Sequence, residues 1–201
     1  MTDMSTILSK LYLTSYRHPD TAPFGNIMLL PEAEAYQKAA QLAAAHPDTT
    51  AFYRFADFAN YYPRRKTSEE ALRQQFIQLG GQPELLHPYS FVLMESRYLA
   101  QWFGNGPAVR VPVAALPKEQ LSFTLGDSMS TFARDGVHQV RTLDNLLDMM
   151  TAHGGTLDDF LAYVETTWTY IEAQVWSRSA LAALSPHSDE RNGASRPQNS
   201  P

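Results

Sequence analysis

Residues 168–176 (WTYIEAQVW) carry the clearest alternation of hydrophobic and polar positions in the chain. Side chains of an extended strand point alternately to opposite faces, so this pattern predicts a strand with two different faces. One face is apolar and typical of a protein core: Ile171, Ala173 and Val175. The other face sets an acid and an amide between two aromatic rings: Tyr170, Glu172, Gln174 and Trp176.

Two interpretations of Glu172 fit this pattern. Aromatic neighbours that bury the face would make it the wall of a cleft, where desolvation raises a carboxyl pKa and a hydrogen-bond partner fixes the side chain. An exposed sheet face would instead leave Glu172 as an ordinary solvated acid. Only the first interpretation gives the residue a chemical role.

The rest of the chain predicts strands and helices in an irregular order. Further strands are expected at residues 10–16, 89–94, 108–113, 120–125 and 137–141. Helices are expected at residues 31–45, 67–79, 95–103, 142–153, 156–166 and 178–184. Strands and helices do not alternate regularly, and no glycine-rich loop follows a strand. We therefore predict an α+β fold with mostly antiparallel strands and peripheral helices, in a single globular domain of residues 1–184.

The composition supports one globular body followed by a segment of a different kind. Hydrophobic residues make up 44% of the 201 residues, which is enough to build a core. Residues 185–201 contain one alanine and no larger apolar side chain, so we expect a disordered tail. The net charge of −5 argues against a protein that holds nucleic acid through a broad basic surface.

Several kinds of site and location are disfavoured. The chain has no cysteine, which excludes disulfides, thiolate zinc sites and thiol catalysis. No two of its six histidines lie within one helical turn in the sequence, and no His-Glu-x-x-His motif is present, so we expect no metal site. The sequence shows no secretory signal and no run of ~18 apolar residues, which predicts a cytoplasmic protein without a membrane span.

Residues 61–66 (YYPRRK) form the most basic spot of the chain. Arginine beside aromatic rings suits a nucleotide, because guanidinium groups bind phosphates with paired hydrogen bonds and stack on planar rings. Tyr62, Arg64 and Arg65 are therefore candidate ligand-binding residues. Thr67 and Glu70 have the spacing of a capping box, so a solvated basic turn ahead of a helix also explains the patch.

Two other function classes fit parts of the sequence. Residues 52–66 are rich in Phe and Tyr and end in arginines, a composition typical of the partner surface of a non-catalytic interaction or regulatory module. A hydrolase is the other class. Glu172 with Glu95 would supply paired carboxylates for N-glycosidic bonds, and Ser128 in a Gly-Asp-Ser turn would be a displayed nucleophile or an ordinary turn residue and helix cap.

The order of these signals resembles that of the ADP-ribosyltransferase fold, specifically the bacterial toxins that ADP-ribosylate thymidine in DNA. In that family an early strand ends in a His-x-Thr-type motif, for which this chain has residues 12–15 (YLTS), with tyrosine in the histidine position. An aromatic segment then leads to a Pro-Arg pair, as residues 52–65 do here. An apolar strand with a short helix, an Asp-Gly-type turn and a late strand with a catalytic Glu follow, as in residues 90–103, 123–128 and 170–175.

The resemblance implies a split-sheet fold that binds NAD between two half-sheets. Tyr12 and Thr14 would lie near the nicotinamide and its ribose, and Arg64 or Arg65 would hold the pyrophosphate. The small molecule that this chain is expected to bind is thus a nucleotide, and not a metal ion.

The resemblance also implies a reaction. Glu172 would hydrogen-bond a ribose hydroxyl and stabilise the oxocarbenium-like state as nicotinamide leaves, or would deprotonate the acceptor. Gln174, on the same strand face, would orient the acceptor. ADP-ribose would then pass to a macromolecular acceptor, either nucleic acid or protein.

Overall fold

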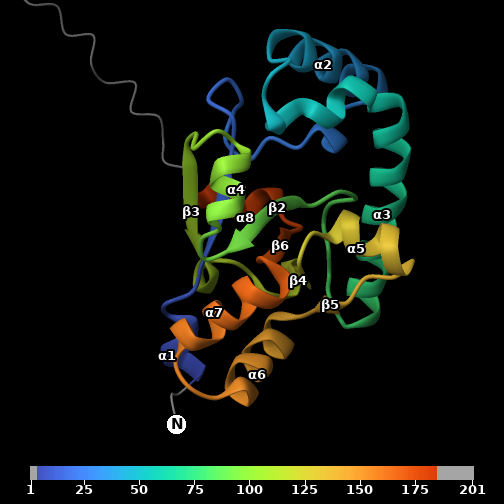
Figure 1. The fold of residues 1–201 in the computed structure, drawn as a ribbon. Coiled ribbons are helices and arrows are strands. Elements are labelled where there is room, and N and C mark those ends of the chain that lie inside the picture. Colours follow the sequence, from blue (N-terminus) through green and yellow to red (C-terminus); the bar gives the residue numbers. More distant parts are fainter. Residues whose placement is uncertain (1–3, 185–201) are drawn as a thin grey trace, which may run out of the picture.

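The computed structural model describes residues 4–184 (Figure 1). They form an α+β fold in which helices pack around one six-stranded antiparallel sheet, so the predicted fold class is confirmed. The tail predicted at residues 185–201 lies outside the described residues. Within residues 4–184, none of the helices has both the length and the apolar composition needed to cross a membrane.

The six strands pair in the order β3-β1-β2-β6-β4-β5, and every neighbouring pair is antiparallel. Their bounds are β1 (Tyr12–Tyr16), β2 (Tyr89–Leu93), β3 (Ala108–Pro112), β4 (Leu121–Leu125), β5 (Val140–Arg141) and β6 (Ile171–Val175). β6 lies inside the sheet, where Glu172 pairs with Val92 on β2 and with Thr124 on β4. The pairing runs through all six strands without a break, so hydrogen bonding does not divide the sheet into the two halves that the resemblance implies.

Local sequence signals explain several of the helices. The α-helices of the described residues are α1 (Met4–Leu8), α2 (Glu32–Ala45), α3 (Phe58–Gln78), α4 (Arg97–Trp102), α5 (Ser128–Asp135), α6 (Leu143–His153), α7 (Leu157–Trp168) and α8 (Arg178–Leu184). Short 3-10 helices are η1 (Ile27–Leu29), η2 (Thr50–Asp57), η3 (Val113–Ala115) and η4 (Lys118–Gln120). Thr142 and Thr156 form capping boxes with Asn145 and Asp159, which is why α6 and α7 begin where the sequence predicts.

The apolar face of β6 lies in the main hydrophobic core. Ile171, Ala173 and Val175 are each at most 1% exposed. Helices α1, α6 and α7, which lie together at the lower end of Figure 1, contribute to this core, for example through Leu146 and Phe160. The face predicted for this side of the strand is confirmed.

The opposite face of β6 is divided between two environments. At one end, Trp176 is fully buried beneath the C-terminal half of α3, where its ring stacks with that of Phe76 at 6.1 Å and packs with Leu72. At the other end, Tyr170 and Glu172 lie outside that contact and line a cavity. One strand face therefore carries both core and site residues.

A small helical layer stands at one end of the sheet, at the top of Figure 1. It consists of η1, α2, η2 and the first half of α3. Its core is separate from the main one and is formed by Met28, Ala35, Ala39, Phe58 and Tyr62. The second half of α3 packs against the sheet, so α3 connects this helical layer to the rest of the fold.

α3 begins at Phe58, well before the predicted capping box, so the predicted start of this helix is wrong. Residues 63–66 are therefore helical and do not form a basic turn. Pro63 removes one main-chain hydrogen bond, which ordinarily weakens a helix. An ion pair supports the helix just after this point: Arg65 Nε lies 2.6 Å from Oε1 of Glu69, which is one helical turn further along α3.

Candidate functional site

A cavity of about 780 Å³ lies between the helical layer and the sheet. Its wall includes β1 and the loop that follows it, η2, the first half of α3, β2, α4, the start of α5 and β6. Segments from most of the chain therefore meet around one space. Cavities of roughly 300–1,000 Å³ are typical of sites for small molecules and cofactors.

Glu172 forms part of the wall of this cavity. Its Oε2 accepts a hydrogen bond of 2.7 Å from the backbone N–H of Ser128, the first residue of α5. Asp127 caps the same helix, because its Oδ1 accepts the N–H of Ser130 at 2.7 Å. Two carboxylates therefore gather at the N-terminus of α5, where unpaired backbone N–H groups favour negative charge.

This crowding changes the protonation of Glu172. Burial, followed by repulsion from Asp127, raises its pKa to about 7, and the hydrogen bond from Ser128 only partly opposes that rise. Tyr170 lies beside the pair, and its hydroxyl donates to Asp127 Oδ2 at 3.5 Å. Burial and the two carboxylates raise the pKa of Tyr170, so its hydroxyl keeps its proton. Glu172 is thus a cavity-lining acid that can exchange a proton near neutral pH.

Arg65 also lines the cavity and has a partner built into the fold. Its Nε is 2.6 Å from Glu69 Oε1, and Glu69 Oε2 is 2.6 Å from Nδ1 of His87. Burial alone would lower the pKa of Arg65, but attraction and hydrogen bonding by Glu69 and Tyr61 together outweigh burial and hold that pKa above its ordinary value. Arg65 therefore supplies a fixed positive charge.

Arg54, a third charged residue of the wall, is held by aromatic side chains. Its Nε donates to the hydroxyl of Tyr53 at 2.8 Å, and its guanidinium carbon lies 5.5 Å from the ring centre of Tyr53 and 5.7 Å from that of Tyr61. Among residues 4–184, no carboxylate forms an ion pair with Arg54. Its charge is therefore available to an anionic ligand.

Aromatic side chains form another part of the wall, next to Glu172. The rings of Tyr98 and Tyr170 stack with centres 6.2 Å apart, and Trp102 contacts Tyr98 at 5.9 Å and Tyr53 at 5.4 Å. Tyr98 and Tyr53 are 48% and 52% exposed. These rings offer a stacking surface to a planar ligand ring.

The cavity wall brings together three of the residues predicted from the sequence: Thr14, Arg65 and Glu172. Thr14 is 2% exposed, and its hydroxyl donates to the main-chain carbonyl of Met94, the residue that follows β2. Tyr12 lies two positions earlier on β1 and is not part of the wall. The guanidinium carbon of Arg110 instead lies over the Tyr12 ring, 5.1 Å from the ring centre. The predicted position of Tyr12 beside the ligand is therefore not supported.

Tyr62 and Arg64 do not line the cavity either. Tyr62 is 7% exposed and packs in the core of the helical layer against Phe58 and Tyr36. Arg64 is exposed and lines a smaller pocket between α3 and α5. Successive residues of an α-helix are turned by roughly 100°, so the Pro-Arg segment delivers only Arg65 to the cavity.

Gln174 is fully buried within the sheet and does not reach the cavity. Its side-chain oxygen accepts from the hydroxyl of Ser122 at 2.8 Å, and its side-chain nitrogen donates to Thr124 Oγ1 at 3.0 Å. The Ser122 hydroxyl also accepts the indole N–H of Trp176 at 2.8 Å. These bonds satisfy buried polar groups between β4 and β6, so Gln174 holds the strand that carries Glu172 and does not contact a bound acceptor.

The two hydrolase candidates have different surroundings. Glu95 is exposed, forms an ion pair with Arg110 and does not line the cavity, so it is not a second carboxylate for Glu172. The carboxylate that does lie near Glu172 is that of Asp127. Asp127, and not Ser128, is also the N-cap of α5. Ser128 does line the cavity, as the hydrogen-bond partner of Glu172.

Sequence reasoning missed Arg54, Tyr98 and Asp127 as wall residues. The Gly-Asp-Ser turn is itself a signal for Asp127, because an acid directly before a helix is a common N-cap. Arg54 has no comparable signal, since it lies in a 3-10 helix whose period is neither that of a strand nor that of an α-helix.

No family model, no curated protein and no solved structure matches this chain. A functional assignment therefore depends on the chemistry of the cavity and on the order of the sequence motifs. The wall combines an acid of raised pKa, three arginines and stacked aromatic rings. This set suits a ligand with anionic groups and planar rings.

Proposed function

We propose that this protein is an NAD-dependent ADP-ribosyltransferase whose active site is the cavity around Glu172. The observation that carries the proposal is the meeting of Thr14, Arg65 and Glu172 at one cavity. They come from an early strand, the Pro-Arg segment and a late strand, which are three motifs in the order that the resemblance requires. A non-catalytic binding module has no need for such a convergence.

NAD offers the groups that this wall is suited to bind. Its pyrophosphate is anionic. Of the three arginines in the wall, Arg65 is paired with a carboxylate and Arg17 donates to main-chain carbonyls of its own loop, whereas Arg54 has neither kind of partner among the described residues. Arg54 is thus the main pyrophosphate ligand, while Arg65 adds positive charge from its position beside Glu69. One of the planar rings of NAD stacks on Tyr98. In this proposal NAD lies against one face of a continuous sheet, not between two half-sheets.

The proposed reaction places the nicotinamide ribose beside Glu172. The bond between ribose C1′ and the nicotinamide nitrogen breaks, and nicotinamide leaves with the bonding electrons. Ionised Glu172 stabilises the positive charge that develops on the ribose. An acceptor nucleophile then bonds to C1′ and releases its proton to Glu172, whose pKa of about 7 suits a base at neutral pH.

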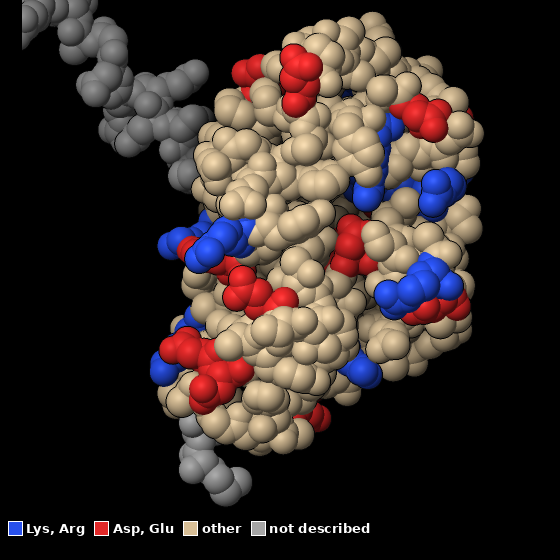
Figure 2. Space-filling model, viewed as in Figure 1, with Lys and Arg blue, Asp and Glu red and all other residues tan. Residues whose placement is uncertain are grey.

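The acceptor in this proposal is a macromolecule, either nucleic acid or protein. On the face shown in Figure 2, Lys and Arg are interspersed with Asp and Glu and form no extended basic area. A nucleic-acid acceptor that lies on this face would therefore be held by contacts with its bases more than by its phosphates. Tyr53 and Tyr98, each about half exposed at the cavity, are suited to such contacts.

Binding of NAD by Arg54 is the first test. Calorimetric titration with NAD compares the wild-type chain with Arg54→Gln and with Arg64→Gln, a matched loss of charge outside the cavity. We expect at least ~10-fold weaker binding for Arg54→Gln, because a hydrogen bond to a charged group contributes about 1.5–3 kcal/mol, and unchanged binding for Arg64→Gln. A folded protein that does not bind millimolar NAD contradicts the proposal, as does equal weakening in both variants.

A further inference from the structure

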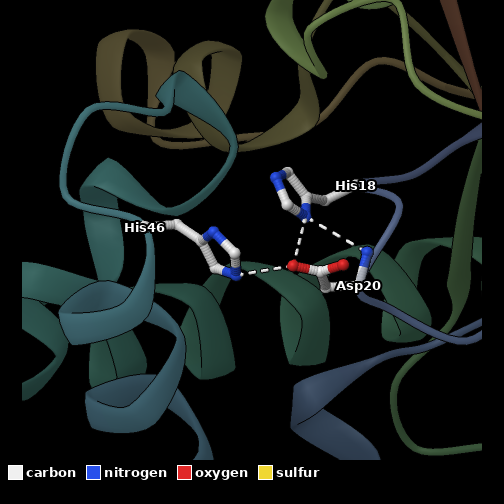
Figure 3. A group of neighbouring side chains, drawn as sticks. All are labelled: His18, Asp20 and His46. Atoms are coloured by element: carbon white, nitrogen blue, oxygen red, sulfur yellow. Dashed lines mark hydrogen bonds and ion pairs between the residues drawn. The ribbon is translucent and has the colours of Figure 1, made fainter.

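Two histidines and one aspartate meet at the edge of the cavity, apart from the residues proposed to bind NAD (Figure 3). His18 and Asp20 belong to the loop after β1, which lines the cavity, and His46 directly follows α2. Asp20 Oδ2 lies 3.0 Å from His46 Nε2 and 4.0 Å from His18 Nδ1. One donor atom from each residue lies within 4.8 Å of the others.

Packing holds the two imidazoles in place. Their ring centres are 4.4 Å apart, and both rings contact the buried ring of Phe52, at 5.0 and 5.5 Å. Arg17 braces the loop, because its Nη1 donates to the carbonyls of His18 and Pro19 at 3.4 and 3.2 Å and to that of Thr21. The three donors therefore sit on a loop and a helix end whose positions are fixed by other contacts.

The separations of the donors suit a small divalent ion. Zinc bonds of roughly 2.0–2.2 Å to nitrogen and oxygen place tetrahedral ligand atoms about 3.3–3.6 Å apart. The observed distances of 3.0 and 4.0 Å lie on either side of that range, so small side-chain rotations bring the donors to coordinating positions. For His18 this movement exchanges the hydrogen bond that its Nδ1 accepts from the backbone N–H of Asp20, at 3.3 Å, for the bond to the ion. Two imidazoles and a carboxylate form a common ligand set for Zn²⁺ and neighbouring transition-metal ions, with one position left for water.

We propose that His18, Asp20 and His46 bind one divalent transition-metal ion, of which Zn²⁺ is the best match. The ion ties the loop after β1 to the end of α2 and so clips the helical layer to the sheet at the edge of the cavity. The site uses none of the residues proposed to bind NAD. It departs from the expectation of no metal site because local spacing in the sequence does not reveal that the fold brings His46 to the other two residues.

Metal titration of the 201-residue chain without a histidine tag tests this proposal. After a chelator has removed bound metals, Zn²⁺ binding is measured by calorimetry and Co²⁺ binding by visible absorption, which reports the ligand geometry. We expect one equivalent of either ion and a rise of the thermal midpoint with Zn²⁺, because the ion binds only the folded chain. Asp20→Asn is the key variant, since the Asp20 side chain is 61% exposed and contributes little packing.

Asp20→Asn and His46→Ala should each weaken Zn²⁺ binding by more than about 100-fold. Loss of a residue that only hydrogen-bonds a metal ligand already costs roughly 10–100-fold, and these two residues are proposed to be ligands themselves. His153→Ala, which removes an exposed histidine of α6, should bind Zn²⁺ like the wild type. Circular dichroism establishes that each variant is folded. The proposal is overturned if the folded wild-type chain binds no Zn²⁺ at micromolar concentration, or if Asp20→Asn and His153→Ala bind it equally well.

Discussion

Replacing Glu172 with glutamine should stabilise the protein at alkaline pH and change its stability little at acidic pH. The carboxyl of Glu172 has a pKa of about 7 in the folded protein, against an ordinary value of 4.5. Between these values the folded chain binds the proton more tightly than the unfolded chain, so the free energy of unfolding falls as the pH rises from about 4.5 to about 7. Glutamine keeps an oxygen for the N–H of Ser128 but brings no charge into the cavity wall.

The size of the effect follows from the two pKa values. A rise from 4.5 to about 7 corresponds to an upper limit of about 3 kcal/mol. Part of the Glu172 side chain is accessible to solvent, which screens its charge and reduces this figure. We expect Glu172→Gln to gain about 1–3 kcal/mol at about pH 8 and less than about 1 kcal/mol at about pH 5.

Urea unfolding of the wild type, Glu172→Gln and Glu165→Gln at these two pH values measures the effect. Glu165 is an exposed residue of α7, so its variant controls for the loss of one negative charge. The stability difference between Glu172→Gln and the wild type should grow with pH, and that for the control should not. A Glu172→Gln variant that is less stable than the wild type at the higher pH refutes the raised pKa, as does a difference that is the same at both.

Three further changes test the surroundings of the site. Asp127→Asn should lower the pKa of Glu172 toward its ordinary value by removing a repulsive charge, and an unchanged pKa in a ¹³C NMR titration of the Glu172 carboxyl would rule this out. Glu69→Gln leaves the largely buried side chain of Arg65 without its charged partner and should cost about 3–5 kcal/mol in urea unfolding, whereas a loss below ~1 kcal/mol would mean that solvent screens the pair. Phe76→Ala should also cost about 3–5 kcal/mol, because this ring fills the contact between α3 and the sheet, and a negligible loss would be incompatible with that packing.

The two faces of β6 could be predicted from the sequence because alternation alone determines them. The environment along the polar face could not be predicted, since it depends on where α3 crosses the sheet. Gln174 and Glu172 are equivalent in the strand pattern, yet Gln174 bonds to neighbouring β4 side chains while Glu172 meets the cavity. A strand pattern therefore identifies a candidate acid but not the residues that accompany it in a site.

The choice between Arg64 and Arg65 was beyond sequence reasoning for a related reason. The aromatic residues ahead of Pro63 span a 3-10 helix and the first turn of α3, so they follow no single period. A proline followed by a capping-box pattern also imitates the start of a helix. Which arginine reaches the cavity depends on the rotation of α3 about its axis, and that rotation is set by packing of the helical layer.

Release of nicotinamide from NAD is the most direct test of the claim that Glu172 catalyses chemistry in this cavity. The wild type, Glu172→Gln and Glu165→Gln are incubated with NAD, with and without DNA or protein acceptors, and free nicotinamide is measured by chromatography. We predict release by the wild type and Glu165→Gln, and at least ~100-fold slower release by Glu172→Gln, because loss of a catalytic base typically costs 10²–10⁴-fold. The unfolding measurements on the same variants show whether each is folded. Equal release by the wild type and Glu172→Gln, or no release by the folded wild type with any of these acceptors, would contradict the proposed activity.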